Sequence, residues 1–447
     1  MAAISFRRLR PLVLLLLWPC AACAPLALSS PQPSPSPSAL PLTPSDQAIV
    51  TAAPRSTVSP AASAEIDEAF HQVERLRGIQ PQGKIPYAWV AQAEIASLTQ
   101  QAFLLGWPLA SLEREVQLLQ RFGLSEPGMD LEDLKAAIGL NGAVVAPSPA
   151  DGLAISTDLD LVDADLLQVV CTYEQLLLRQ AYLDEDPARQ MESCLADVDG
   201  CLARRALLAG DAALLAEQWS RTFGASSPAL SGGSVCIPLQ PATEAGSQGL
   251  VPSLTFPEVY GVEFARTLFL KAGWAGVDQA YASPPISTEQ ILHPERYPKD
   301  TPRPPIFPDP ASALGADWTT DDMGTLGEWR TRLVLNAYLD PEQALLAAEG
   351  WDGDQYALLT NNSLGSRALA LHTRWDTVRD AHEFSGAFRT YGESRFGPAK
   401  RDGTALTWTT PSGVVILDVG NDQTLWIEAP DSATAAALRE VTGFPLY

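Results

Sequence analysis

The chain has 447 residues, of which 46% are hydrophobic, and its formal net charge at pH 7 is −23. Because nucleic acids and anionic lipid surfaces are themselves negative, this charge argues against either of them as the main partner. The length exceeds what one hydrophobic core usually organises, so we expect two or three subdomains.

The first 22 residues predict a secretory signal. A basic start, MAAISFRRLR, precedes an apolar run, PLVLLLLWP, that is too short to span a membrane as a helix. Cleavage before Cys23 would leave a cysteine at the new N-terminus, with Ala21 and Ala22 upstream. This arrangement resembles a bacterial lipobox, although Cys20 stands where an aliphatic residue is usual. We expect residues 1–22 to be a lipoprotein signal peptide and Cys23 to be lipidated; an ordinary cleaved signal without a lipid is the alternative.

Residues 23–63 consist largely of Pro, Ser, Ala and Thr. Such a segment cannot bury enough apolar surface to offset the entropy lost on ordering, so we expect a disordered, extended tether. A lipid on Cys23 followed by this tether would hold a folded body off the outer face of a bacterial membrane. No later apolar run is long enough to span a bilayer.

Residues 64–235 are predicted to form a mainly helical domain. Ile66, Phe70 and Val73 recur near the 3.6-residue period of a helix, and Gly78 is a stop signal. The other elements expected here are helices at 94–106, 111–123, 129–139, about 163–182 and about 200–223, and two short strands around a Pro/Gly turn within 142–157.

Residues 236–349 are predicted to be a helical and proline-rich middle region, with helices at 256–273 and 326–339. The Gly/Ser/Pro-rich stretch 231–257 predicts a long surface connection, and prolines exclude a long helix across 284–310. In residues 350–447 the order β-β-α-β-β-β-α predicts a small antiparallel-sheet subdomain with helices on one face. The fold class is therefore α+β.

Four cysteines lie beyond the signal: Cys171, Cys194, Cys201 and Cys236. Outside the cytosol they permit two disulfides in three possible pairings, and their spacing matches no zinc cluster. A continuous helix over 194–201 would hold its ends about 10 Å apart, too far for a bridge. Because Asp199-Gly200 makes an unbroken helix doubtful, that pairing stays open.

The helix expected at 163–182 contains CTYEQLLLRQ, and a later one contains ALLAGDAALL. A zinc peptidase of the HExxH kind places two histidines on one helical face, a glutamate general base beside the first, and a third ligand on a later helix. The chain has four histidines (His71, His293, His372 and His382), and no two have that spacing.

From about residue 76 to about residue 384, the sequence resembles a family of bacterial, mostly uncharacterised zinc metallopeptidases that are often secreted lipoproteins. In that family the two helices read roughly HExxHALxDQ and AL-x-EGDA. The stretches that fit, in order, are LRGIQP, Gln180, Gly210-Asp211-Ala212, STEQILHPERY, LGEW, GWDGDQY and RWDTVRDAHEF. The resemblance implies a zincin-like helical core.

The zinc site is where the chain departs from the family. On the family pattern, Cys171 stands at the first His, Thr172 at the catalytic Glu, Gln175 at the second His and Ala209 at the third ligand; Arg179 replaces the Asp of DQ. Cysteine could bind zinc as a thiolate, but threonine is no base at neutral pH, glutamine is a poor zinc donor and alanine has no donor atom. We therefore expect no zinc and no other cofactor.

Glu174 and Asp211 are weak candidates for a rebuilt site. On an ideal helix Glu174 lies about 60° around from Cys171, so the pair could face one cleft together with Asp211. The simpler interpretation is favoured: Cys171 in a disulfide or packed as a small apolar residue, Glu174 exposed, and Asp211 capping or hydrogen-bonding locally.

Other stretches favour structural roles. STEQILHPERY contains His293 and Tyr297 but has the form of a helix that begins at Ser287 or Thr288 and ends at Pro294, so packing is favoured over lining a cleft. WDGD, at residues 351–354, lacks the remaining acids of an EF-hand and predicts a turn. HEFSG, from His382, predicts a solvated helix face, and neither a nucleophile elbow nor a phosphate loop is present.

We therefore expect a lipid-anchored, extracytoplasmic relative of zinc metallopeptidases that has lost catalysis and binds a peptide, protein or cell-envelope ligand. One alternative is an active hydrolase using a cleft around Cys171, Glu174 and Asp211. Another is a solute-binding lipoprotein, although no alternating βαβ series that could build its two lobes is present. No nucleic acid is expected as a partner.

Overall fold

The structure, a computed structural model, describes residues 58–124, 140–148, 152–161, 163–183, 192, 194–224, 236 and 249–445. The predicted signal peptide with Cys23, nearly all of the predicted tether and the helix expected at 129–139 lie outside these residues. Among the described helices, none combines the length and the apolar character needed to cross a membrane.

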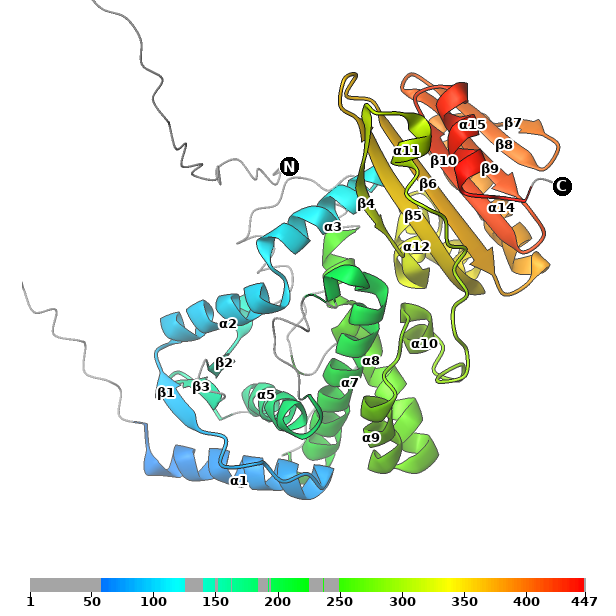
Figure 1. The fold of residues 1–447 in the computed structure, drawn as a ribbon. Coiled ribbons are helices and arrows are strands. Elements are labelled where there is room, and N and C mark those ends of the chain that lie inside the picture. The colour runs from blue at the N-terminus through cyan, green and yellow to red at the C-terminus, as the bar shows by residue number, and fades with distance from the viewer. Residues whose placement is uncertain are drawn as a thin grey trace, which may run out of the picture. The chain divides into compact units, whose positions relative to one another are not determined.

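The other predicted helices of the N-terminal half are confirmed to within a few residues (Figure 1). They are α1 (Pro60–Arg77), α2 (Gln92–Gly106), α3 (Leu109–Arg121), α5 (Asp163–Tyr182) and α7 (Val198–Phe223). α1 begins earlier than predicted, because the side chain of Ser59 accepts a hydrogen bond from the N–H of Ala62 and Pro60 suits the first helical turn. Residues 60–63 of the predicted tether therefore belong to a helix.

A small three-stranded sheet lies in this half of the chain. The two strands predicted within 142–157 are confirmed as β2 (Val145–Ser148) and β3 (Gly152–Ser156), which pair antiparallel after a short 3₁₀ turn, η1 (Leu140–Gly142). β1 (Tyr87–Val90) was not predicted and pairs parallel with β3, which gives the order β1-β3-β2.

The middle region holds α8 (Leu250–Ala272), α9 (Trp274–Ala282), α10 (Thr288–Leu292), α11 (Ala311–Leu314), α12 (Gly327–Asn336) and α13 (Pro341–Ala348). The predicted surface connection is wrong for residues 250–257, which form the first turns of α8. Leu250, Leu254 and Phe256 are buried there, and Pro257 lies inside the helix. Apolar burial therefore outweighs the one backbone hydrogen bond that Pro257 cannot donate.

α7 and α8 cross with their backbones in direct contact. A Cβ added to Gly210 would overlap the carbonyl oxygen of Gly261, and a Cβ added to Gly261 would overlap that of Ala206. Two helix backbones can approach this closely only at glycine, because glycine has no Cβ atom. Gly210, which matches the family pattern, therefore has a packing role in this chain.

The C-terminal region is built on a seven-stranded antiparallel sheet. Its elements are β4 (Trp318–Gly324), β5 (Trp351–Asn361), β6 (Arg367–Trp375), α14 (Val378–Phe396), β7 (Lys400–Asp402), β8 (Ala405–Thr410), β9 (Gly413–Val419), β10 (Gln423–Ala429) and α15 (Ser432–Val441). The strand order is β4-β5-β6-β10-β9-β8-β7. The predicted antiparallel sheet and its two helices are confirmed, whereas β4 and the short β7 were not predicted.

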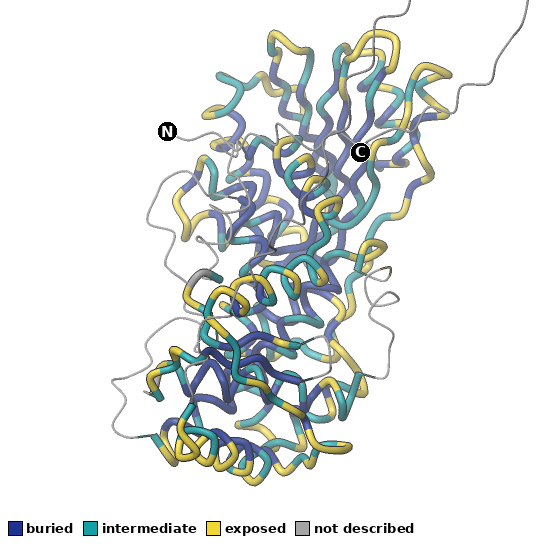
Figure 2. The backbone as a smooth tube through the Cα atoms, turned by 90° about the vertical axis from the view of Figure 1, so that its left-hand side faces the viewer, coloured by how far each residue is buried: buried dark blue, intermediate teal, exposed yellow. Residues whose placement is uncertain are grey.

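The prediction that helices cover one face of this sheet is wrong. Side chains alternate between two faces along a strand. Leu369 of β6 and Phe388 of α14 belong to one hydrophobic cluster, while Ala370 of β6 and Leu438 of α15 belong to another. Both faces are therefore buried, and Figure 2 shows the buried segments, in dark blue, running through these strands.

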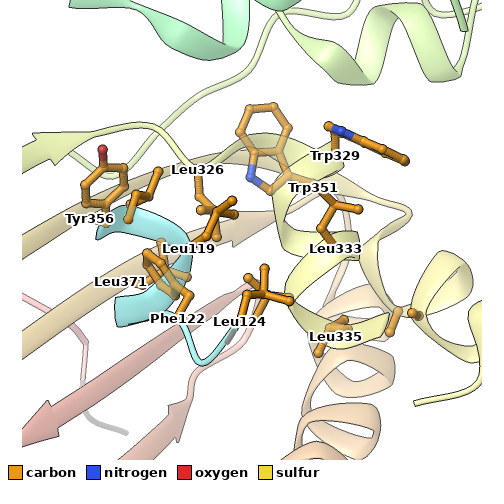
Figure 3. Packing of buried hydrophobic residues seen from close by; sticks show 14 of the residues in the cluster. Leu119, Phe122, Leu124, Leu326, Trp329, Leu333, Leu335, Trp351, Tyr356 and Leu371 are labelled. Carbon is orange, nitrogen blue, oxygen red and sulfur yellow. The ribbon is translucent and has the colours of Figure 1, made fainter. Parts of the chain in front are cut away.

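One hydrophobic cluster joins the helices to the sheet. Figure 3 shows Leu119 and Phe122 beside Leu326 and Tyr356, and the ring centroids of Phe122 and Trp426 lie 5.3 Å apart. The described residues form one compact unit. Two α/β lobes around a hinge, which a solute-binding lipoprotein would need, are not present within these described ranges.

Replacing Gly210 by Ala is expected to lower the free energy of unfolding by about 1–3 kcal/mol, because the added methyl group forces α8 away from α7. Gly386→Ala is the matched control. Gly386 lies on an exposed face of α14, where nothing lies within 4 Å of an added Cβ, so the change should raise stability by about 0.5–1 kcal/mol. Urea unfolding measures both, and equal effects would contradict the close crossing.

Candidate functional site

Four helices meet around the guanidinium of Arg77, the last residue of α1. Its Nε and Nη2 donate hydrogen bonds to the two carboxylate oxygens of Asp211 on α7, at 3.2 and 3.0 Å. Nη2 also donates to Asp278 on α9 at 2.6 Å, and Nε lies 3.3 Å from Oε1 of Glu174 on α5. We call Arg77, Glu174, Asp211 and Asp278 the Arg77 centre. The side chains of the first three are fully buried, and that of Asp278 is 38% exposed.

Negative charge exceeds positive charge in the Arg77 centre, because three carboxyl groups share one arginine. Neither oxygen of Glu174 has a hydrogen-bond partner among the described residues. Burial, and next the charge of Asp211, raise the pKa of Glu174 well above its ordinary value. Burial also raises the pKa of Asp211, although Arg77 opposes this shift. The centre therefore takes up protons when the chain folds.

Aromatic rings surround the Arg77 centre. Tyr281 donates to Asp211 at 3.0 Å, and its ring stacks on Tyr182 with the two centroids 4.4 Å apart. The guanidinium of Arg77 lies over the ring of Trp274, 4.5 Å from its centroid, which is a cation–π contact. In such an apolar enclosure ion pairs are strengthened, and an unpaired charge becomes costly.

The positions that the resemblance assigns to zinc ligands lie on helices that pack against each other, α5 and α7. Cys171 is bonded to Cys236, so it offers no thiolate. The hydroxyl of Thr172 donates to a backbone carbonyl one turn earlier in its own helix. Gln175 is half-buried, and Ala209 is buried without a donor atom. These residues do not fit a zinc ion.

The alternative hypothesis placed Glu174 and Asp211, together with Cys171, around a catalytic cleft. Glu174 and Asp211 do lie close together, but both contact the buried Arg77. The expectation that Glu174 is exposed is wrong, because its side chain is fully buried against Arg77. The expectation that Asp211 bonds locally is also wrong, since Arg77 is 134 residues away in the sequence. With Cys171 in a disulfide, no cysteine nucleophile is available there.

The Gln180 position that matches the family also has a structural role. Its side-chain oxygen accepts from the N–H of Gln82 at 3.1 Å, and the amide of Gln82 donates to the carbonyl of Gln180 at 2.8 Å. The end of α5 is thereby tied to the segment that follows α1. Gln82 follows α1 by a few residues, so this contact holds α1 and α5 together at the same end as the Arg77 centre.

Two disulfides resolve the open pairing: Cys171–Cys236 and Cys194–Cys201, with Cα–Cα distances of 5.3 and 4.9 Å. Helical backbone stops at Asp197, whose side chain accepts from the N–H of Gly200 and begins α7. Because 194–201 is not one continuous helix, its ends can come within bridging distance. Disulfides persist in oxidising compartments, so this chain belongs outside the cytosol.

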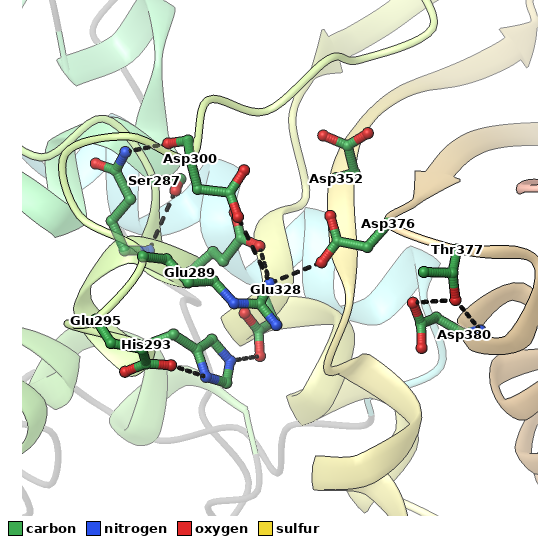
Figure 4. A network of polar contacts seen from close by, with 12 residues as sticks. Ser287, Glu289, His293, Glu295, Asp300, Glu328, Asp352, Asp376, Thr377 and Asp380 are labelled. Carbon is green, nitrogen blue, oxygen red and sulfur yellow. Dashed lines mark hydrogen bonds and ion pairs between the residues drawn. The ribbon is translucent and has the colours of Figure 1, made fainter.

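A second polar network surrounds Arg296 (Figure 4). Its Nη1 donates to Glu289 at 2.5 Å and to Asp376 at 2.9 Å, and lies 4.0 Å from Asp300. We call Glu289, Arg296, Asp300 and Asp376 the Arg296 network. It joins α10, the loop after α10 and the connection from β6 to α14.

The stretch STEQILHPERY forms a helix start as predicted, with Ser287 accepting from the N–H of Gln290. His293 does more than pack: its Nε2 lies 2.8 Å from Oε1 of Glu328, on α12. Burial lowers the pKa of His293, but the hydrogen bond with Glu328 overrides it, so the net shift is upward. Tyr297 packs its ring against Phe264, as expected for a packing role.

The stretch WDGD is not a turn but the start of β5, with a shift in register between Trp351 and Asp354. Asp354 accepts from the N–H groups of Leu326 and Gly327 and so stabilises the start of α12. A local bulge re-aims a side chain in this way without ending the strand. His382 lies on an exposed face of α14, as predicted.

Sequence reasoning did not identify either arginine as a centre of charge. Arg77 lies in LRGIQP and Arg296 in STEQILHPERY, two stretches that had already been singled out. Arg77 and Arg296 each contact carboxylates that come from distant parts of the chain. Their partners Glu174, Asp278 and Asp376 could not be assigned from spacing alone.

One protein family matches part of the chain: residues 317–439 match a domain of unknown function (DUF8575). The match begins one residue before β4 and ends within α15, so it covers the seven-stranded sheet rather than the Arg77 centre. No curated protein and no solved structure matches the chain. The likeness to zinc metallopeptidases therefore stays a prediction from the sequence.

Replacing Glu174 by Gln is expected to flatten the dependence of stability on pH. Because the pKa of Glu174 is raised in the folded chain, folding binds a proton and becomes less favourable as pH rises above the unfolded pKa of about 4.3. Glutamine binds no proton, so the variant should gain stability over the wild type by up to about 1.4 kcal/mol per pH unit.

Urea unfolding between about pH 5 and pH 8 measures this effect. Asp309→Asn is the control, because a hydrogen bond from Thr320 lowers the pKa of Asp309 and moves its titration below that range. An unchanged pH slope in the Glu174→Gln variant would show that Glu174 is ionised and stably paired in the folded protein.

Proposed function

We propose that this chain is an extracytoplasmic lipoprotein that descends from zinc metallopeptidases, has lost catalysis, and binds a peptide, protein or cell-envelope ligand without cleaving it. The observation that carries the proposal is the Arg77 centre. In it Arg77 binds carboxylates from α5 and α7, the two helices that would carry a peptidase site.

The chemistry of this centre supports binding rather than hydrolysis. Arg77 is always charged and cannot polarise a bound water as a metal ion does. Glu174 is fully buried, so it cannot reach a substrate as a general base. Each of the cysteines Cys171, Cys194, Cys201 and Cys236 is in a disulfide and provides no nucleophile.

The hollow between α3 and the start of α7 is too small to hold a peptide. It is lined by Trp107, Arg114 and Leu195, among others, and has a volume of about 30 Å³. That volume holds no more than a few water molecules. A peptide or envelope polymer would therefore lie along the surface instead of entering such a hollow.

The anchoring part of the proposal comes from the sequence. The signal, the lipobox-like CAAC and the Pro/Ser-rich tether together predict a lipid on Cys23. The two disulfides support an oxidising compartment, which is consistent with export. A single acyl chain binds a membrane only marginally, so stable anchoring takes more than one.

Mature protein is expected to contain substoichiometric zinc and to leave a broad peptide library intact, because Cys171, Thr172, Gln175 and Ala209 do not fit a zinc ion and Glu174 is fully buried. Metal analysis of the purified full chain and mass spectrometry of the library measure this. The same protein should retain selected library peptides or co-sediment with peptidoglycan. One zinc per chain, together with cleavage that Glu174→Gln abolishes, would sink the proposal.

Replacing Cys23 by Ser is expected to release the protein from the membrane fraction, because the thiol that takes the lipid is lost. Metabolic labelling with a fatty acid and membrane fractionation measure the outcome. Cys20→Ser is the matched control, since Cys20 is removed with the signal if cleavage precedes Cys23. If both variants stay soluble like the wild type, the chain is secreted without a lipid.

A further inference from the structure

Arg205, on α7, is a half-buried cation that forms no ion pair with any described carboxylate. Its Nη2 donates a hydrogen bond to the carbonyl oxygen of Gly106, at the end of α2, at 2.6 Å. The guanidinium also lies over the ring of Trp107, 4.3 Å from its centroid. Its Nε and Nη1 donate to no described residue and are not enclosed by the protein. Both nitrogens can therefore donate to a ligand.

Arg205 lines the small hollow between α3 and the start of α7. The volume of about 30 Å³ has room for about two or three water-sized atoms. One wall contains the disulfide Cys194–Cys201 and Leu195, whose side chain is 40% exposed. Because the disulfide closes this loop and Arg114 donates to the carbonyl of Leu195 at 3.0 Å, the wall is fixed before a ligand binds.

The other charged groups that line the hollow are already paired. Arg114 donates from Nε to Asp322 at 3.1 Å, and Glu115 accepts from Arg330 at 2.8 and 3.0 Å. These two pairs add no net charge, so the charge of Arg205 makes the hollow positive. On a chain whose formal net charge is −23, such a hollow is complementary to an anion.

The neighbours of Arg205 do not stabilise its charge. Burial is the main cause that lowers the pKa of Arg205 to about 10. The charges of Arg179 and Arg204 act in the same direction, whereas Glu258 on α8 opposes them. Burial raises the pKa of Glu258 to about 7, so at neutral pH Glu258 carries only part of a negative charge. A bound anion would supply the countercharge that Arg205 lacks.

We propose that this hollow binds the C-terminal carboxylate of a peptide whose last residue is apolar, with Arg205 as the donor to the carboxylate. The inference rests on the proposed function, of which it specifies the ligand. The two oxygens of a carboxylate match the room in the hollow, whereas a phosphate group brings four. Hydrogen bonds from a guanidinium to a carboxylate are charge-assisted and therefore strong.

The apolar side chain of the ligand would lie on the rim of the hollow. Trp107 and Leu195 line it, and Leu105 and Leu109, which flank Trp107 in the chain, are 76% and 37% exposed. Only the last residue of a peptide carries a carboxylate and an apolar side chain on the same Cα. The rest of the peptide would then lie along the surface outside the hollow.

The test compares two peptides on the full, disulfide-intact chain. One is a fluorescein-labelled Ser-Ala-Ser-Ala-Leu with a free C-terminal carboxylate, and the other is its C-terminal amide, which has no charge at that end. We expect wild type to bind the acid at least about tenfold more tightly than the amide, because the amide loses the charge-assisted hydrogen bond to Arg205. Fluorescence anisotropy measures both affinities.

Arg205→Gln should bring the affinities for the acid and the amide close together, because it removes the charge that distinguishes them. Leu195→Asp should do the same by placing a negative charge on the rim, and its exposed position keeps the test valid if Arg205→Gln fails to fold. Arg221→Gln is the matched control. It removes the same charge from the same helix, at a side chain that is 73% exposed and paired with Glu217, so the preference for the acid should remain.

The inference is overturned if wild type shows no saturable binding of the acid, or binds the acid and the amide equally. It is also overturned if the preference survives Arg205→Gln and Leu195→Asp, or is lost equally in Arg221→Gln. Retention of library peptides without a preference for the acid would contradict this inference and leave the proposed function standing. Cleavage of the library with the preference intact would contradict the loss of catalysis and leave this inference standing.

Discussion

The burial of Arg77 with its carboxylates fixes how the helices of the N-terminal half pack together. Moving a charged group out of water costs several kcal/mol, and the loss is offset only where hydrogen bonds and opposite charges are placed correctly. Asp211, Glu174 and Asp278 reach Arg77 from three different helices. The positions of α1, α5, α7 and α9 relative to one another are therefore fixed together. The close contact at Gly210 and Gly261 then fixes the position of α8 against α7.

The two arginine-centred networks solve the same electrostatic problem differently. Arg77 binds Asp211 through two nitrogens, which is the geometry that makes a guanidinium an effective partner for a carboxylate. Arg296 instead contacts several carboxylates through one nitrogen. In the first network Arg77, Glu174 and Asp211 are fully buried and Asp278 is partly exposed, whereas in the second both Asp300 and Asp376 are partly exposed.

The stretches that resemble a peptidase family are those that hold the fold together. LRGIQP supplies Arg77 and the GDA stretch supplies Asp211, while STEQILHPERY, LGEW and RWD meet in or beside the Arg296 network. None of these contacts requires a zinc ligand at Cys171, Gln175 or Ala209. On the proposed descent, the fold therefore does not depend on the residues that hold zinc in the family. Shared descent also need not imply a shared activity.

Much of the local structure follows from the sequence alone. Apolar residues at helical spacing predicted α1, α2, α3, α5 and α7, with glycine stops for the first three, and local patterns also predicted five strands and the two helices of the C-terminal region, because such patterns act over a few neighbouring residues. Composition alone misplaced the start of α8, where distant apolar partners outweigh a local proline. The pattern of strands also could not show that both faces of the sheet are covered.

Only the tertiary structure decided which charges meet. Glu174 was expected to be exposed and no role was predicted for Arg77, whereas the packing of α1, α5 and α7 buries the two side chains together. The two disulfide pairings were likewise open until Asp197 was seen to interrupt the helix between Cys194 and Cys201. Hydrophobic periodicity is a property of neighbours in the chain, whereas the environment of a charge depends on residues a hundred or more positions away. The sequence by itself therefore determined the elements, and the packing of those elements decided their chemistry.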